Sequence, residues 1–218
     1  MSIFAIVCSL LLWQSSKLGV AADSRTAPES ISEPIRKVLD EKAVVITDGD
    51  TELLAIWFRK AIPSKATAEQ VKNGLTSREL PETAVIGAVK FAKPFVDYRK
   101  QEIPAGVYTL RLGFQPENGD HMGTAPHAEF LLLSPVNEDK SLDETDLKSV
   151  VAMSKKATGV DHPGVMLLFP YRGEKAGPLL DEKEGGVKVV QVKRTIAVDG
   201  KETALGFGIV VAGVSKTR

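Results

Sequence analysis

All three histidines of the chain lie in segments that lack the periodicity of helices or strands. His121 and His127 belong to one Gly- and Pro-containing segment, and His162 precedes a Pro-Gly pair. Imidazole nitrogens combined with a carboxylate could bind a zinc-like ion. The same groups could act as a general acid–base pair near neutral pH. The candidate ligand-binding residues are therefore Asp120, His121, His127, Asp161 and His162, and the three histidines are the candidates for a metal site.

A simpler interpretation of the same residues is structural. Asp120 and Asp161 would cap turns, and the histidines would form local hydrogen bonds that stabilise the loops. The metal and acid–base hypotheses require the loops to meet, which the sequence does not establish. Three further loop residues are placed where they could contact a ligand, namely Tyr98, Tyr171 and Arg172. We therefore assign no catalytic residue and expect no cofactor.

Short catalytic motifs are absent from the sequence. It contains no G-x-S-x-G, H-E-x-x-H, S-x-x-K or phosphate-binding P-loop motif. Gly206-Phe207-Gly208 continues as Ile-Val-Val, which does not complete a dinucleotide-binding motif. The single cysteine, Cys8, lies in an apolar N-terminal segment. Thiol catalysis, an internal disulfide and a cysteine-rich zinc site are therefore excluded for the rest of the chain.

The balance of basic and acidic residues bears on the kind of partner that the protein can bind. The 218 residues include 28 basic and 28 acidic side chains, and 43% of the residues are hydrophobic. These values are typical of a globular chain and disfavour disorder or a low-complexity protein. Proteins that hold nucleic acid mainly through phosphate contacts are usually basic, so we expect no nucleic-acid partner.

The N-terminal segment has the pattern of a signal peptide. Residues 3–13 are almost wholly apolar, and Val20-Ala21-Ala22 offers the small residues that signal peptidase accepts before its cleavage site. The apolar run is shorter than the roughly 20 residues that span a bilayer, although an uncleaved anchor stays open as the alternative because no Lys or Arg precedes Ile3. We expect residues 1–22 to be removed by cleavage between Ala22 and Asp23. The mature chain would then be extracytoplasmic, periplasmic or secreted, without membrane insertion.

Most of the remaining sequence has the pattern of short antiparallel strands. Residues 43–47 and 53–58 flank Asp48-Gly49-Asp50 and predict a hairpin with a loop of two or three residues. The clearest strand covers residues 108–115, where side chains alternate between two sets. A period of two places one set in the core (Tyr108, Leu110, Leu112, Phe114) and the other toward water (Thr109, Arg111, Gly113, Gln115).

The last hairpin has a predictable register. With Asp199-Gly200 as a two-residue turn, Val198 pairs with Lys201 and Val192 pairs with Phe207. One face then collects the apolar residues Val190, Val192, Ile196, Leu205, Phe207 and Ile209. Arg194 falls on this apolar face and must lie at its rim or have a partner. Gly206 and Gly208 lie on the other face, where we expect another backbone or a helix to pack closely.

Two segments have helix start signals. Thr67-Ala68-Glu69-Gln70 has capping-box spacing before a stop at Asn73-Gly74, and Ser141-Leu142-Asp143-Glu144 precedes an apolar stripe that stops at Gly159. We therefore expect short helical turns and one α-helix over about residues 142–158. The predicted fold is mainly β, a single antiparallel β-sandwich of about eight strands over residues 35–218, preceded by a flexible arm at residues 23–34.

A distinctive pattern covers residues 103–116, IPAGVYTLRLGFQP, and residues 119–126, GDHMGTAP. In this pattern the sequence resembles a family of secreted bacterial β-sandwich proteins of unknown function. Asp97-Tyr98-Arg99, Trp57-Phe58-Arg59-Lys60 and His162-Pro163 belong to the same pattern. The resemblance implies a fold and a compartment, and no activity.

Three functions are consistent with these observations. The first is a non-catalytic binding or interaction module whose ligand is an unidentified protein or carbohydrate, contacted by the histidine-bearing loops. The second is a metal-dependent or acid–base hydrolase that uses His121, His127 and His162. The third is a structural component of the cell envelope. Convergence of the three imidazoles on one point would favour the second over the first.

Overall fold

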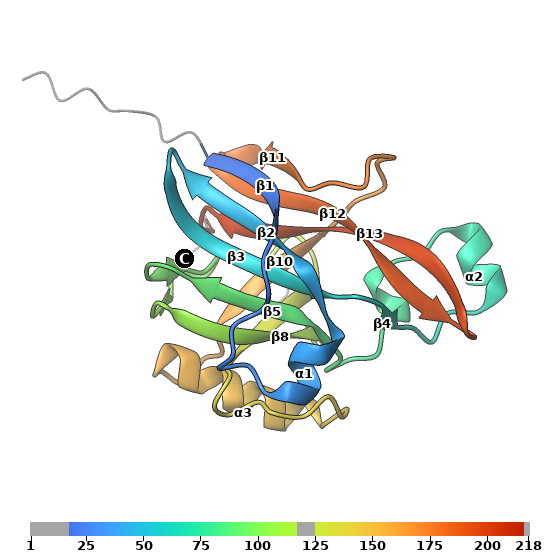
Figure 1. The fold of residues 1–218 in the computed structure, drawn as a ribbon, viewed down its shortest axis with the longest axis horizontal. Helices are drawn as coiled ribbons and strands as arrows, with labels where there is room; N and C mark the ends of the chain where they lie inside the picture. The colour runs from blue at the N-terminus through green and yellow to red at the C-terminus, as the bar shows by residue number, and fades with distance from the viewer. Residues whose placement is uncertain (1–17, 117–124, 216–218) are drawn as a thin grey trace, which may run out of the picture.

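The computed structural model describes residues 18–116 and 125–215 (Figure 1). Thirteen strands lie within these residues: β1 (Leu18–Ser24), β2 (Leu39–Asp48), β3 (Thr51–Arg59), β4 (Ile62–Pro63), β5 (Val85–Phe91), β6 (Phe95–Val96), β7 (Glu102–Ile103), β8 (Gly106–Phe114), β9 (Glu129–Pro135), β10 (Val165–Pro170), β11 (Leu179–Lys183), β12 (Val187–Val198) and β13 (Lys201–Ala212). The α-helices are α1 (Glu33–Val38), α2 (Ala68–Asn73) and α3 (Leu147–Thr158), and single 3-10 turns lie at Ser77–Glu79 and Glu184–Gly186.

Eleven of these strands form one curled sheet. Its order is β1-β2-β3-β5-β8-β9-β10-β13-β12-β11, and β4 pairs in parallel with β12, whereas β6 and β7 pair separately. The sheet curls until its two edge strands, β1 and β11, contact each other (Figure 1). The prediction of a mainly β, largely antiparallel fold is confirmed. The prediction of a sandwich with about eight strands is not, because strands pair in an almost unbroken series and their twist curls one sheet around the core.

The main core fills the inside of the curl. It collects one face of each long strand, including Ile46, Ile56, Leu110, Leu133, Leu168 and Phe207, all of which are almost completely buried. On β8 the predicted inward set is largely confirmed, since Tyr108, Leu110 and Leu112 are buried there. The inner face therefore follows the period of two that the sequence shows.

The outer face of the sheet is covered in separate places. Residues 25–38, including α1, pack over β2, β3 and β5, where Ile31 and Ile35 are buried against Trp57. The Trp57 indole Nε1 donates a hydrogen bond to the Arg25 carbonyl at 3.0 Å. The segment that we expected to be a flexible arm, residues 23–34, thus lies against the sheet, held by apolar residues that are too few to show a periodicity. The helix α3 covers β9 and β10 instead.

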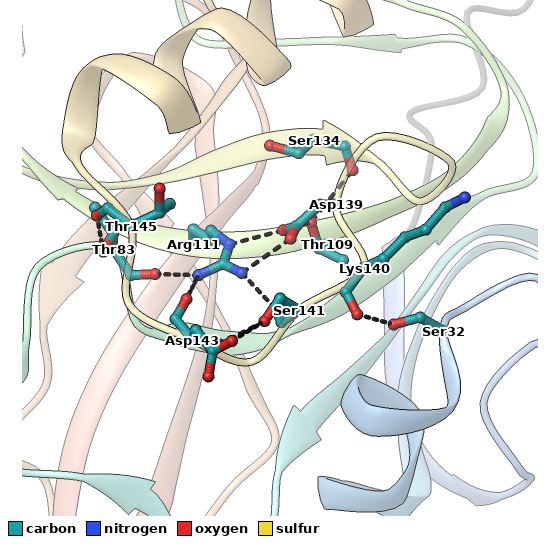
Figure 2. Close-up of polar contacts among 10 residues, drawn as sticks. All are labelled: Ser32, Thr83, Thr109, Arg111, Ser134, Asp139, Lys140, Ser141, Asp143 and Thr145. Carbon is teal, nitrogen blue, oxygen red and sulfur yellow. Dashed lines mark hydrogen bonds and ion pairs between the residues drawn. The ribbon is translucent and has the colours of Figure 1, made fainter.

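The prediction that Thr109 and Arg111 face water is wrong. Thr109 has 0% of its surface exposed and Arg111 has 1%, because the segment 137–146 before α3 covers the outer face of β8 (Figure 2). The carboxylate of Asp139 accepts hydrogen bonds from Arg111 Nε at 2.7 Å and from Nη2 at 2.9 Å. The alternation correctly separates the two faces of the strand, but both faces are buried.

The same arginine explains why α3 begins later than predicted. The expected helix start at Ser141 is wrong, since the helix starts at Leu147 with Asp146 as its N-cap. The carbonyl of Ser141 accepts a hydrogen bond from Arg111 Nη2 at 2.5 Å, and that of Asp143 accepts one from Nη1 at 3.2 Å (Figure 2). These carbonyls face Arg111, so the segment remains outside the helix. By contrast, the capping box of Thr67 and Gln70 on α2 is confirmed.

Both hairpin turns contain two residues. Asp48 pairs with Thr51 around Gly49-Asp50, which resolves the open choice of loop length. In the last hairpin Val198 pairs with Lys201 and Val192 with Phe207, as predicted, with Asp199 and Gly200 both at positive φ. Arg194 has its expected partner: its Nη2 lies 2.8 Å from Asp40 Oδ2, and its guanidinium lies over the Phe58 ring.

The close approach predicted beside Gly206 is present. A Cβ atom on Gly206 would lie 2.2 Å from the carbonyl oxygen of Tyr171, so the neighbouring segment passes where a side chain would otherwise be. The packing partner is therefore another backbone, and not the helix α3.

The first strand includes the predicted cleavage site. Seven residues of β1 pair with β2 in antiparallel register, from Leu18 opposite Asp48 to Ser24 opposite Lys42. The peptide bond between Ala22 and Asp23 lies inside this ladder, opposite Val44 and Ala43. In the part of the chain that the structure describes, no helix is long and apolar enough to cross a membrane.

Candidate binding cavity

A cavity of about 380 Å³ opens on the outer face of the sheet, beside α3. Its apolar lining includes Phe130 and Leu132 of β9, Val165 and Leu167 of β10, and Val151 of α3. Its polar lining comes from Tyr98, Arg99, Gln115, Asp161 and His162. Ligand pockets usually have volumes of about 300–1,000 Å³, with a mainly apolar lining and a few polar groups. The cavity has this character and would suit a small ligand.

A glycine on β8 shapes one wall of the cavity. Gly113 pairs with Phe130 of β9, and a Cβ atom on Gly113 would lie only 2.6 Å from the Phe130 ring. The aromatic ring therefore lies across the neighbouring strand, in space that any side chain at position 113 would occupy. Part of the apolar wall thus depends on the absence of a side chain on the adjacent strand.

Three side-chain hydrogen-bond donors, from the buried Ser154 and the half-buried Thr158 and Gln101, hold the loop that carries His162. Thr158 Oγ1 donates to the His162 carbonyl at 2.7 Å, and Ser154 Oγ donates to the Gly164 carbonyl at 2.9 Å. The Gln101 amide Nε2 donates to the Pro163 carbonyl at 3.0 Å and lies 3.2 Å from His162 Nδ1. The imidazole therefore lines the cavity from a backbone that is fixed to both α3 and the β6–β7 turn.

Asp97 forms hydrogen bonds with the backbone of Arg99 and with Gln101, and so connects the Arg99 side of the cavity with the His162 side. This residue is fully buried, and its Oδ1 accepts hydrogen bonds from the backbone N–H groups of Arg99 and Gln101, both at 2.9 Å. Its Oδ2 accepts a hydrogen bond from Gln101 Nε2 at 2.9 Å. Burial raises the pKa of the Asp97 carboxyl, against the opposing effect of these hydrogen bonds. Asp97 therefore positions Arg99 directly and His162 through Gln101.

The charges around the cavity are unequally paired. Lys155 Nζ lies 2.5 Å from Asp161 Oδ1, and the hydrogen bond and charge of this lysine lower the pKa of the Asp161 carboxyl. Among the described residues, none forms a hydrogen bond or ion pair with the Arg99 guanidinium, although Arg99 lines the cavity. The acidic group is thus neutralised by its own partner, while a cation remains available to a ligand.

His127 lines a different cavity, of about 240 Å³, together with Arg78, Glu129, Tyr171 and Arg172. Its ring packs edge-on against Phe169, with 4.5 Å between the ring centroids. Arg78 Nε lies 3.1 Å from Glu129 Oε1, and the Arg78 guanidinium lies over the Phe114 ring. This smaller cavity has a more polar lining than the one beside α3.

The structure thus separates the residues that the sequence analysis grouped together. Asp161 and His162 line the larger cavity and His127 lines the smaller one, whereas Asp120 and His121 lie outside the described residues. Within residues 18–116 and 125–215, no three His, Cys, Asp or Glu side chains form a group that could hold a metal ion. Of the other loop residues considered, Tyr98 lines the larger cavity, and Tyr171 and Arg172 line the smaller one.

The apolar lining is not recognisable from the sequence as part of a site. Phe130, Leu132 and Val165 are apolar residues of short strands, and Val151 belongs to the apolar stripe of a helix. Each of them has the pattern of a core residue. The one signal in the sequence was the strand 108–115 with its glycine at position 113, beside which a large ring can pack.

The Arg111 cluster is the other conspicuous polar group, and it is closed. All five N–H groups of the Arg111 guanidinium have acceptors: both oxygens of Asp139 and the carbonyls of Thr83, Ser141 and Asp143 (Figure 2). Thr109 Oγ1 donates to the same Asp139 carboxylate at 2.6 Å. No donor of this guanidinium remains for a ligand, so the cluster is structural.

Comparisons of the chain with protein-family models, with curated proteins and with solved structures give no match.

Proposed function

We propose that this protein is a non-catalytic binding module whose site is the cavity beside α3. The observation that carries the proposal is a cavity of about 380 Å³ with an apolar lining on β9, β10 and α3 and polar groups from two fixed loops. Apolar lining supplies affinity through burial, and a few oriented polar groups supply specificity. In keeping with the N-terminal sequence, the module acts outside the cytoplasm.

The arrangement of the histidines favours binding over hydrolysis. His127 and His162 line separate cavities, so neither can serve as the acid or base partner of the other at one bound substrate. His162 is instead held by hydrogen bonds as part of the lining of the larger cavity. Recognition of a small ligand needs only this fixed lining.

The proposal is tested with the uncharged fluorescent probe N-phenylnaphthylamine, whose emission rises in apolar surroundings. We expect a saturable increase in emission with the wild-type protein, excited where tryptophan does not absorb. The variant Val151→Trp places an indole in the cavity from α3 and should abolish the increase. Val151 is half-buried and lines the cavity, so the larger side chain occupies ligand space.

Ala152→Trp provides the matched control, because Ala152 is the next residue on α3 and is exposed to solvent. This variant should bind the probe as the wild type does. Absence of saturable binding to the wild type, or equal binding to Val151→Trp, would overturn the proposed site.

A further inference from the structure

The cavity beside α3 has one cation without a counter-charge. Arg99 lines it, and no described residue pairs with the Arg99 guanidinium. Among the described residues of the lining, the one acidic side chain is that of Asp161, which is 97% exposed and already paired with Lys155. A bound ligand would therefore encounter the positive charge of Arg99 at one side of a mainly apolar space.

The backbone at this cation is fixed. The N–H of Arg99 donates to the buried Asp97 carboxylate, and the carbonyl of Tyr98 accepts a hydrogen bond from the backbone N–H of Ser215 at 2.8 Å. A guanidinium on a fixed backbone can form two parallel hydrogen bonds to a planar or tetrahedral anion. The half-buried Tyr98 ring lies next to it in the lining.

We propose that the ligand is a small amphipathic monoanion, whose apolar body occupies the space between α3, β9 and β10 and whose anionic group binds Arg99. This inference rests on the proposed function and adds the chemical class of the ligand. The volume of about 380 Å³ restricts the apolar body to the size of a fused aromatic pair or a medium-length alkyl chain. A carboxylate and a sulfonate share the chemistry that Arg99 recognises.

The test compares two probes with the same aromatic body. Anilinonaphthalenesulfonate carries a sulfonate, and N-phenylnaphthylamine does not. We expect the anionic probe to bind the wild type at least tenfold more tightly, because a charge-assisted hydrogen bond contributes about 1.5–3 kcal/mol and 1.4 kcal/mol is a factor of ten. Its affinity should fall as salt is added, while that of the neutral probe should not.

Substitution of Arg99 tests whether its positive charge is responsible for the tighter binding of the anionic probe. Arg99→Gln should weaken the anionic probe about tenfold and leave the neutral probe unchanged. Arg172→Gln is the matched control, since it removes the same charge from the exposed arginine of the smaller cavity. Octanoate should displace the anionic probe more effectively than octanol, which has the same alkyl chain and no charge.

The outcomes separate this inference from the proposed function. Equal affinity for both probes, with no effect of Arg99→Gln, would overturn the anionic ligand while the cavity remains a binding site. An equal loss of anionic affinity in Arg99→Gln and Arg172→Gln would also overturn it, because the effect would then be one of net charge. Absence of binding by either probe would overturn the proposed function itself.

Discussion

Arg111 and Arg99 both lie on the side of the sheet away from the main core, but their surroundings differ. Arg111 is 1% exposed and uses all five of its guanidinium N–H groups within the protein. Arg99 is fixed through its backbone, while its guanidinium lines a cavity without a described partner. A buried charge without partners is strongly unfavourable, so the first arginine must be saturated in order to be buried. The comparison is consistent with a stabilising role for Arg111 and with the proposal that Arg99 binds a ligand.

The largest effect is expected from Arg111→Met. This change leaves the buried Asp139 carboxylate and the carbonyls of Thr83, Ser141 and Asp143 without the guanidinium donor, and breaking such a buried charge pair typically costs about 3–5 kcal/mol of the free energy of unfolding. Urea unfolding measures the loss. The double variant Arg111→Met, Asp139→Leu removes the buried charge as well and should be more stable than the single variant. A loss below about 1 kcal/mol in the single variant would contradict a stabilising role for Arg111.

A smaller and pH-dependent effect is expected from Asp97→Asn. Because burial raises the pKa of Asp97, the folded protein retains this proton to a higher pH than the unfolded chain does. The contribution of Asp97 to the free energy of unfolding therefore falls as the pH rises from about 4 through the raised pKa. Asparagine does not titrate, so the stability difference between wild type and variant should change across this range in urea unfolding. A difference that stays constant with pH would contradict the raised pKa.

The smallest effect on stability is expected from Arg99→Gln. The guanidinium forms no described hydrogen bond, and the backbone contact with Asp97 does not depend on the side chain. The free energy of unfolding should therefore remain within about 0.5 kcal/mol of wild type, as for other surface substitutions. The same urea unfolding measurement applies, and Arg172→Gln should behave alike. A large loss of stability would mean that Arg99, like Arg111, stabilises the fold.

The sequence predicts those parts of the fold that depend on neighbouring residues. The register of the last hairpin follows from the Asp199-Gly200 turn, because a two-residue turn fixes the pairs that follow it, here as far as Val189 opposite Val210, beyond which the register shifts before Lys188. The capping box of Thr67 and Gln70 is a local signal in the same sense. Alternation along residues 108–115 identifies the two faces of β8, but it does not show that the segment 137–146 covers the second face.

The cavity was only partly predictable, because the sequence predicts the features that depend on neighbouring residues. Its lining comes from segments around residues 98, 115, 130, 151 and 165, which are far apart in the sequence and meet only in the folded sheet. Asp161 and His162 were identified through their residue types and loop position. Arg99 could be noticed only as part of the sequence resemblance. The sequence around a single loop arginine does not show whether its guanidinium has a partner in the folded protein.

The pairing of β1 with β2 determines the order of signal-peptide cleavage and folding at this end of the chain. Signal peptidase, like other proteases, needs an accessible and extended peptide bond, whereas the Ala22–Asp23 bond lies within a hydrogen-bonded ladder. Cleavage there, if it takes place, must therefore precede the docking of this strand. Processing would remove Leu18–Ala22 and make β2 an edge strand with unpaired N–H and C=O groups, at the side of the sheet where β1 contacts β11. The mature protein would then have an open edge at β2 after export, and another extended segment could pair with that edge.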